Sequence, residues 1–116
     1  MSKRTYDQPY HFQSMTPTGN SQATAAPIDV KASPGFVTAT GDAVTGLILP
    51  PASKGKEYNI KNVGTTQLQI LNLYPPVGGF INSQAVNTPI AMGPQTSAQF
   101  IADGSATWHS SPVVPS

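Results

Sequence analysis

The chain has 116 residues and no cysteine, and only 9% of its residues are charged, with a formal net charge of +1. The length favours one domain, and the lack of cysteine excludes disulfide frameworks and cysteine-based zinc sites. No apolar run reaches the roughly 18 residues of a membrane helix, and the scattered basic residues form no positive stripe. We therefore expect neither a membrane nor a nucleic acid as partner. Ser, Thr, Asn and Gln supply 37 residues, and such a weakly charged polar surface suits contact with other proteins.

Residues 1–33 hold several prolines, a polar tract and few aliphatic side chains. Too little apolar surface is present to offset the entropy of ordering, which predicts an extended or flexible N-terminal arm. Tyr6, Tyr10 and Phe12 share one parity, so their rings point to the same side of an extended segment. Two interpretations stay open: a loose tail with incidental aromatics, or an arm that docks these rings on a partner.

From residue 34 onward the sequence predicts short strands separated by turns. Polar and apolar residues alternate in EYNIKN at 57–62 and in TQLQIL at 66–71, a pattern typical of strands with one buried face. VGTT and ADGSA have the composition of hairpin turns. No segment has a helical period, and 12 prolines leave little room for long helices. Further strands are expected over 36–40, 44–50, 97–102 and 106–109.

This spacing of strands and turns predicts an all-β domain over residues 34–116, a sandwich or a barrel built from antiparallel strands. We find no internal repeat. The alternation also predicts the core. Its expected members are Leu47, Leu49, Tyr58, Ile60, Leu68, Ile70, Phe100 and Trp108.

Residues that carry chemistry are few and scattered. Asp42 and Asp103 each neighbour a glycine, the usual position of an aspartate in a turn. His11 and His109 lie far apart, so they give no metal-ligand spacing, and no G-x-S-x-G pattern marks a nucleophilic serine. A Ser-His-Asp site would have to be assembled by the fold. We predict that the chain is not an enzyme and uses no metal or cofactor.

The segment NLYPPVGGFINSQ at 72–84 concentrates prolines, glycines and two aromatic residues. Proline lacks a backbone donor and ends the preceding strand, and the glycines permit a reversal of the chain. The segment therefore reads as a corner of the scaffold that also contacts a partner. Tyr74 and Phe80 are the candidate contact residues.

The order LILPPASKGKEYNIKNVGTTQLQILNLYPPVGGFIN, followed by FIADGSATWH, resembles a pattern in structural proteins of tailed-bacteriophage virions. Over residues 44–109 this pattern has a strand ending in Leu-Pro, a Tyr-x-Ile-x-Asn strand and a closing strand with Trp. Together with the polar arm, it is most similar to small head decoration (cement) proteins. The resemblance implies a jelly-roll-like antiparallel β-sandwich.

The resemblance also implies a function, which is to bind the outer surface of the phage head and to stabilise contacts between major capsid subunits. The expected partners are the major capsid protein and other copies of this chain, as a dimer or trimer. The arm would anchor the protein through Tyr6, Tyr10 and Phe12, with Lys3 and Arg4 steering it toward an acidic shell. The alternative is a tail-fibre or receptor-binding module, because similar patterns occur in fibres.

Overall fold

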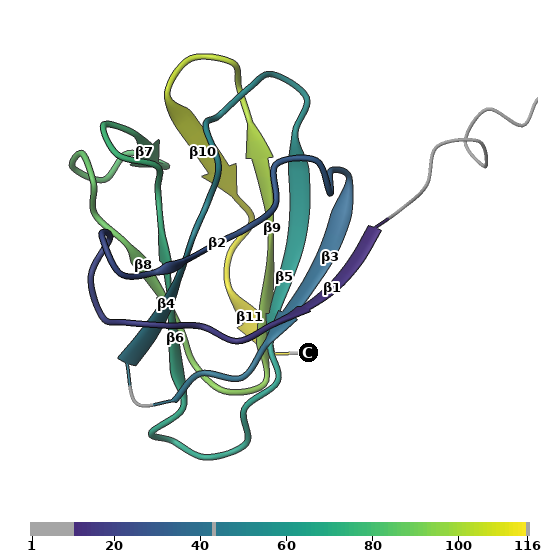
Figure 1. Ribbon diagram of the computed structural model, residues 1–116, viewed down its shortest axis with the longest axis vertical. Coiled ribbons are helices and arrows are strands. Elements are labelled where there is room, and N and C mark those ends of the chain that lie inside the picture. Colours follow the sequence, from purple (N-terminus) through teal and green to yellow (C-terminus); the bar gives the residue numbers. More distant parts are fainter. Residues whose placement is uncertain (1–10, 43, 116) are drawn as a thin grey trace, which may run out of the picture.

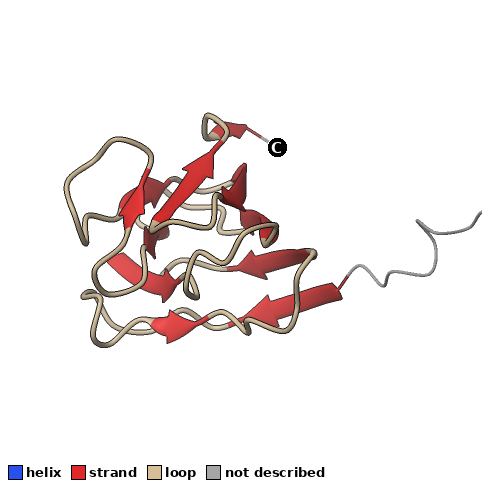
Figure 2. Ribbon diagram, turned by 90° about the horizontal axis from the view of Figure 1, so that it is seen from above, coloured by secondary structure: helices blue, strands red, loops and turns tan. Residues whose placement is uncertain are grey.

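The computed structural model describes residues 11–42 and 44–115. Within these ranges the chain consists of strands joined by loops and turns and contains no helix, which confirms the predicted all-β class (Figures 1 and 2). Accordingly, none of the described segments is a helix long and apolar enough to cross a membrane.

The strands form two hydrogen-bonded sheets, here called sheet A and sheet B. Sheet A has the order β1-β3-β5-β9-β10-β7, with β11 paired to β9, and sheet B has the order β2-β4-β6-β8. The bounds in sheet A are β1 His11–Met15, β3 Gly35–Ala39, β5 Glu57–Asn62, β7 Phe80–Ile81, β9 Thr96–Ala102, β10 Thr107–Ser110 and β11 Val114–Pro115. Those in sheet B are β2 Ala26–Pro27, β4 Val44–Ile48, β6 Ile70–Tyr74 and β8 Ile90–Met92.

The first six strands wind the chain into a short coil that visits both sheets in every turn. Strands β1, β3 and β5 are parallel neighbours in sheet A, and β2, β4 and β6 are parallel neighbours in sheet B. This is the winding of a two-sheet β-solenoid. The turns differ in length, which explains why the sequence shows no repeat. Partners lie 24 (His11 and Gly35) and 23 (Gly35 and Tyr58) positions apart in sheet A, and 21 (Ala26 and Leu47) and 26 (Val44 and Ile70) in sheet B.

The predicted antiparallel pairing holds for the pairs that involve β8 or β9. The jelly-roll-like arrangement is wrong, because the other five pairs of described strands, including all those between turns of the coil, are parallel. The VGTT segment does not close a hairpin, because β5 lies in sheet A and β6 in sheet B. Alternating side chains show only that one face of a strand is buried, and they fit parallel and antiparallel neighbours equally well. The second expected hairpin is confirmed, since ADGSA joins the antiparallel strands β9 and β10.

The core lies between the two sheets and draws on both. Six of the eight predicted core residues are buried there, including Tyr58 and Trp108, whose rings lie 5.7 Å apart. The Trp108 indole nitrogen donates a hydrogen bond of 2.9 Å to the Pro50 carbonyl, so its polar atom is satisfied inside the core. Both sheets therefore form one folding unit around one apolar cluster.

The two remaining core predictions, Leu68 and Ile70, are wrong. Residues 66–69 form a turn instead of a strand, and Leu68 is 79% exposed. The strand begins at Ile70 and has the opposite phase, so Leu71 and Leu73 enter the core. A shift of one residue moves every side chain of a strand to its other face.

The expected arm divides into two parts. Residues 1–10 lie outside the described residues. Residues 11–33, in contrast, form the first turn of the coil, with β1 paired to β3 and β2 paired to β4. Ile28 is buried in the core, and its backbone nitrogen donates to the Ile48 carbonyl. Few aliphatic residues suffice in this segment because the strands of the next turn satisfy its backbone groups.

Candidate functional site

Strands β1 and β3 carry an aromatic pair on the outer face of sheet A, which we call the aromatic patch (Phe12 and Phe36). Phe12 is 70% exposed, although phenylalanine is usually buried. Its ring stacks on that of Phe36 with the centroids 5.6 Å apart and the planes inclined by 10°. The register of the two strands places them side by side, since Phe12 is the partner of Phe36. Such a preorganised apolar surface is suited to contact another macromolecule.

The strand that carries Phe12 lies at the free edge of sheet A. Beyond β1 the structure places no other described strand, and Figure 1 shows it at the outer margin of the molecule. The His11 nitrogen donates to the Pro34 carbonyl at 3.0 Å, so the odd-numbered residues of β1 direct their backbone groups toward β3. The backbone groups of Phe12 and Ser14 therefore point away from the sheet. They form an edge that can accept another strand.

The outer face of sheet A next to the patch is polar and carries little charge. One row of side chains crosses four adjacent strands, and its members are Ser14, Thr38, Lys61 and Ser97. The row that contains the aromatic pair continues with Asn59 and Gln99. Glu57 and Lys61 on β5 are the charged residues of this face within β1, β3, β5 and β9. Docking here would desolvate few charges, which lowers its cost.

Of the contact residues predicted in the arm, Phe12 lies within the described ranges. Phe12 is exposed at the edge, whereas Lys3, Arg4, Tyr6 and Tyr10 lie outside the described residues.

Tyr74 is not available as a contact residue. It is only 6% exposed, and its ring covers Gly46 so closely that a Cβ atom there would lie 2.7 Å from the ring carbon Cε2. Phe80 is half-buried, with its backbone nitrogen bonded to the Ala106 carbonyl at 2.9 Å. The prolines end β6 after Tyr74, as expected, and the aromatic residue before them serves the scaffold.

The corner at Pro75–Gly79 borders a shallow depression of about 180 Å³. It is lined by Pro51, Ala52, Pro76, Val77, Gly78, Gly79, Ser105 and Ala106. The corner is fixed by Asn87, whose Oδ1 accepts hydrogen bonds from the Gly78 nitrogen and from Gln22 Nε2. Ser105 supplies the one side-chain hydroxyl of the lining, so the depression offers no group for acid–base chemistry.

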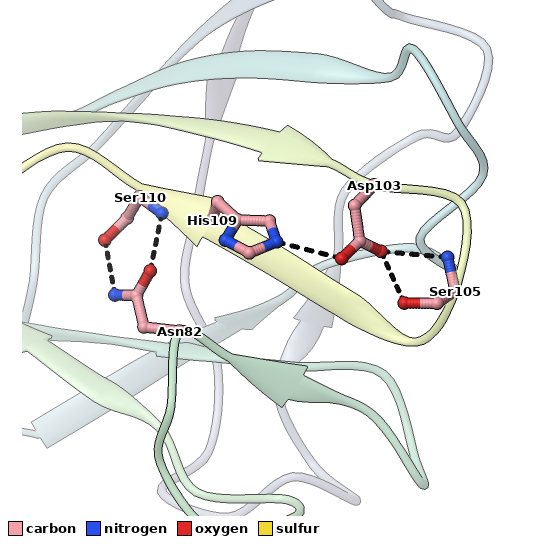
Figure 3. A network of polar contacts seen from close by, with 5 residues as sticks. All are labelled: Asn82, Asp103, Ser105, His109 and Ser110. Atoms are coloured by element: carbon pink, nitrogen blue, oxygen red, sulfur yellow. Dashed lines mark hydrogen bonds and ion pairs between the residues drawn. The ribbon is translucent and has the colours of Figure 1, made fainter.

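A polar cluster lies at the β9–β10 hairpin (Figure 3), and one of its members, Ser105, also lines this depression. Asp103 accepts two hydrogen bonds at Oδ1, from the backbone nitrogen (2.8 Å) and the hydroxyl (2.6 Å) of Ser105. His109 Nε2 contacts the other carboxylate oxygen, Oδ2, at 2.8 Å. These partners, Ser105 first and then His109, hold the pKa of Asp103 well below its usual range. The turn position predicted for Asp103 is thus confirmed.

This cluster does not have the geometry of a Ser-His-Asp site. In such a site the histidine lies between the nucleophilic serine and the aspartate. Here the aspartate lies between Ser105 and His109, and the serine hydroxyl is engaged by the carboxylate. Both side chains are in contact with water, with side-chain exposures of 59% for His109 and 35% for Asp103. The arrangement ties the hairpin together at the surface.

A second polar pair joins β10 to the corner after β7. Asn82 Nδ2 donates to the Ser110 hydroxyl at 2.9 Å, and the Ser110 nitrogen donates to Asn82 Oδ1 at 2.9 Å (Figure 3). Asn82 has a φ of 56°, a conformation that asparagine adopts more readily than most residues. Among residues 11–42 and 44–115, no group of three or more His, Cys, Asp or Glu side chains is placed to hold a metal ion.

Sequence reasoning missed Phe36 as a site residue because it was assigned only to a strand. The signal that identifies it is the register between β1 and β3, which depends on parallel pairing over 24 positions and is not visible in either segment alone. No protein-family model matches the chain, and no curated protein or solved structure shows significant similarity to it.

Proposed function

We propose that this chain is a structural protein of a bacteriophage virion, namely a decoration (cement) protein on the outer surface of the head. The observation that carries the proposal is the aromatic patch, in which the exposed ring of Phe12 stacks on the half-buried ring of Phe36 on a weakly charged face. The resemblance of residues 44–109 to phage virion modules supports the same assignment. In this role the chain binds the major capsid protein and stabilises contacts between its subunits.

Such a role requires binding free energy and no chemical reaction. Full burial of one phenylalanine side chain contributes about 1.5–3 kcal/mol, and the stacked ring of Phe36 limits the entropy lost when Phe12 becomes ordered on a partner. Many copies on a symmetric shell contribute together. In the hairpin cluster the Ser105 hydroxyl donates to the Asp103 carboxylate, which also contacts His109, so these contacts stabilise the hairpin without a substrate.

A second candidate is a tail-fibre or receptor-binding module. One observation favours it: parallel turns of a coil stack in one direction, and β1, which begins the first turn, lies at a sheet edge next to which no further described strand is placed. Further strands could continue such a stack, as a fibre requires. The two candidates differ in the number of copies, which is large on a head and small on a tail.

The test is to incubate the full chain with undecorated phage heads and with tails, and to measure the copies bound per particle by quantitative gel analysis and electron microscopy. We expect binding to the outer surface of heads and a higher temperature of shell disruption. Binding to tails alone would favour the second candidate, and binding to neither particle would contradict both.

A matched pair of variants tests the aromatic patch itself. Phe12→Ser removes the exposed ring and should weaken shell binding about 10- to 100-fold, as expected from the burial of one phenylalanine. Leu68→Ser removes a side chain of comparable exposure from the 66–69 turn and should leave binding unchanged. Equal effects of the two substitutions would show that the patch is not the contact surface.

A further inference from the structure

Within residues 11–42 and 44–115, the edge of sheet A at β1 lacks the features that normally prevent edge pairing. Strand β1 reads HFQSM, with no proline and no Lys, Arg, Asp or Glu. It pairs with β3 over five consecutive residues without a bulge. Exposed edges are usually protected by charges, prolines, bulges or a covering segment. An edge without these features is suited to accept a strand from outside.

A buried amide group at this edge also lacks a partner. Gln13 lies at the centre of β1 with its side chain on the inner face, and its Nε2 atom is buried without a hydrogen bond to the described part of the chain. Buried donors are nearly always paired, because an unpaired one costs free energy. A group that joins the edge beside Gln13 would remove this cost if it brings a carbonyl oxygen toward which the amide turns.

We propose that the partner at this edge is a second copy of the chain, with the two β1 strands antiparallel around a two-fold axis at Gln13. Phe12 of one copy then lies opposite Ser14 of the other. The outward backbone groups of these two residues exchange two hydrogen bonds, and the symmetric pair exchanges two more. The two Gln13 residues face each other as a non-hydrogen-bonded pair with closely spaced side chains, so each amide can donate to the carbonyl oxygen of the other.

In this symmetric pairing the inner and outer faces of sheet A continue across the axis into the inner and outer faces of the second copy. Residues opposite each other across the axis keep the same orientation, so Phe12 and Ser14 stay on the outer face and Gln13 on the inner face. The two aromatic patches become diagonal neighbours on one continuous outer surface. The inference deepens the proposed function, since a dimer presents twice the aromatic surface to the shell. The dimer itself is tested with the free protein, in the absence of phage heads.

The first experiment measures the mass of the free chain by sedimentation equilibrium over a range of concentrations. The average mass should rise from 12.1 kDa toward twice that value. Ser14→Pro removes one outward backbone donor and none directed at β3, so it should raise the dissociation constant at least about 10-fold with little change in the folded structure. Ser14→Ala keeps that donor and should dimerise like the unmodified chain. Circular dichroism reports whether each variant is folded.

A cysteine experiment tests the register, and the chain is suited to it because it has no cysteine of its own. Opposed residues in a non-hydrogen-bonded pair have Cα atoms about 4.5 Å apart, within the disulfide range of about 4.4–6.8 Å. Gln13→Cys should therefore form an intermolecular disulfide under mild oxidation. Ser14→Cys serves as the matched control, because its two copies are displaced along the strands beyond about 7 Å.

The outcomes separate the inference from the proposed function. Dimers cross-linked at position 13 and not at position 14 support the two-fold pairing. Cross-linking at position 14 that equals or exceeds that at position 13 overturns the register. A chain that stays monomeric at all concentrations and cross-links at neither position overturns the pairing itself. A monomer that still binds heads would leave the proposed function intact and refute only this inference.

Discussion

Asn62 connects more segments than any other side chain of the described structure. It is fully buried at the end of β5, and its Nδ2 donates to the carbonyls of Gln69, Met92 and Gly93. Its Oδ1 accepts hydrogen bonds from the nitrogens of Gly41 and Gly64. One amide thereby satisfies the backbone of several connections between the two sheets. The composition of EYNIKN gives no hint of this role, because its partners are distant in sequence.

We predict that Asn62→Asp lowers the free energy of unfolding by at least about 3 kcal/mol. The substitution replaces the donor that faces three carbonyl groups by an oxygen, and it places a charge in a site that water does not reach. Urea unfolding at neutral pH measures the change. Asn20→Asp, at an exposed position, is the control and should have little effect. Equal midpoints for both variants would show that the buried amide is dispensable.

Tyr58 makes stability depend on pH in the alkaline range. Its hydroxyl donates to the Asp29 carbonyl at 2.9 Å, and burial, with a smaller contribution from the Asp29 charge, raises its pKa to about 12. In the unfolded chain tyrosine ionises near pH 10. Because the folded pKa is the higher one, the stabilisation is complete below about pH 10 and is lost as the pH rises through 12.

We therefore expect Tyr58→Phe to unfold with a weaker dependence on pH between 10 and 12 than the unmodified chain. At neutral pH the same substitution should cost about 0.5–1.5 kcal/mol, since it removes one hydrogen bond and keeps the ring. Thermal unfolding at a series of pH values measures both effects. Identical alkaline slopes for the two proteins would rule out ionisation of Tyr58 as the cause.

At the scale of single elements, the sequence predicted that β5, β9 and β10 are strands, and it predicted their buried faces. Tyr58, Ile60, Phe100 and Trp108 are buried as expected because the alternation in these segments is regular and continues to the strand ends. The alternation in TQLQIL was misleading. Its first four residues, 66–69, form a turn in which Gln69 Oε1 accepts hydrogen bonds from the nitrogens of Thr65 and Thr66. The alternation of polar and apolar residues there does not reflect a strand.

Leu71 and Leu68 lie in one segment and differ in burial, so one serves as the matched control for the other. Leu71→Ala should destabilise the protein by about 2–5 kcal/mol, because Leu71 is 0% exposed and its truncation leaves a cavity. Leu68→Ala, three residues earlier, should change the free energy of unfolding by less than about 0.5 kcal/mol, since this side chain lies in water. Chemical denaturation of both variants decides between the two phases of the strand. A larger loss of stability for Leu68→Ala would support the phase predicted from the sequence, in which Leu68 faces the core.

For the whole molecule, composition and periodicity predicted an all-β chain but not its winding. Parallel pairing joins residues 21 to 26 positions apart, and the register depends on contacts between turns that no local pattern records. The same limit applies to the candidate site. The parity of Phe12 predicted only that its ring shares one side of an extended segment with the rings of Tyr6 and Tyr10. Its stacking partner on β3 could be identified only after β1 was placed beside that strand.

The winding also changes where the folded unit begins. Strands β1 and β2 belong to the first turn, so a chain that starts at Pro34 would lose the strand paired to β3 and one edge strand of sheet B. It would also lose Ile28, which is buried in the core and whose full burial contributes about 1.5–3 kcal/mol. Sequence reasoning placed the domain boundary at this position. The structure makes residues 11–33 part of the core instead.

We predict that the chain 34–116 is less stable than the full chain by more than about 3 kcal/mol, because the lost burial adds to unpaired backbone groups on β3 and β4. Urea unfolding followed by tryptophan fluorescence measures this, since Trp108 lies in the shared core. Phe12→Ser in the full chain is the control: it removes an exposed ring, keeps the pairing of β1 and should cost less than about 1 kcal/mol. If the shortened chain unfolds at the same urea concentration as the full chain, residues 11–33 contribute nothing to the core, and the division into an arm and a separate β-domain is restored.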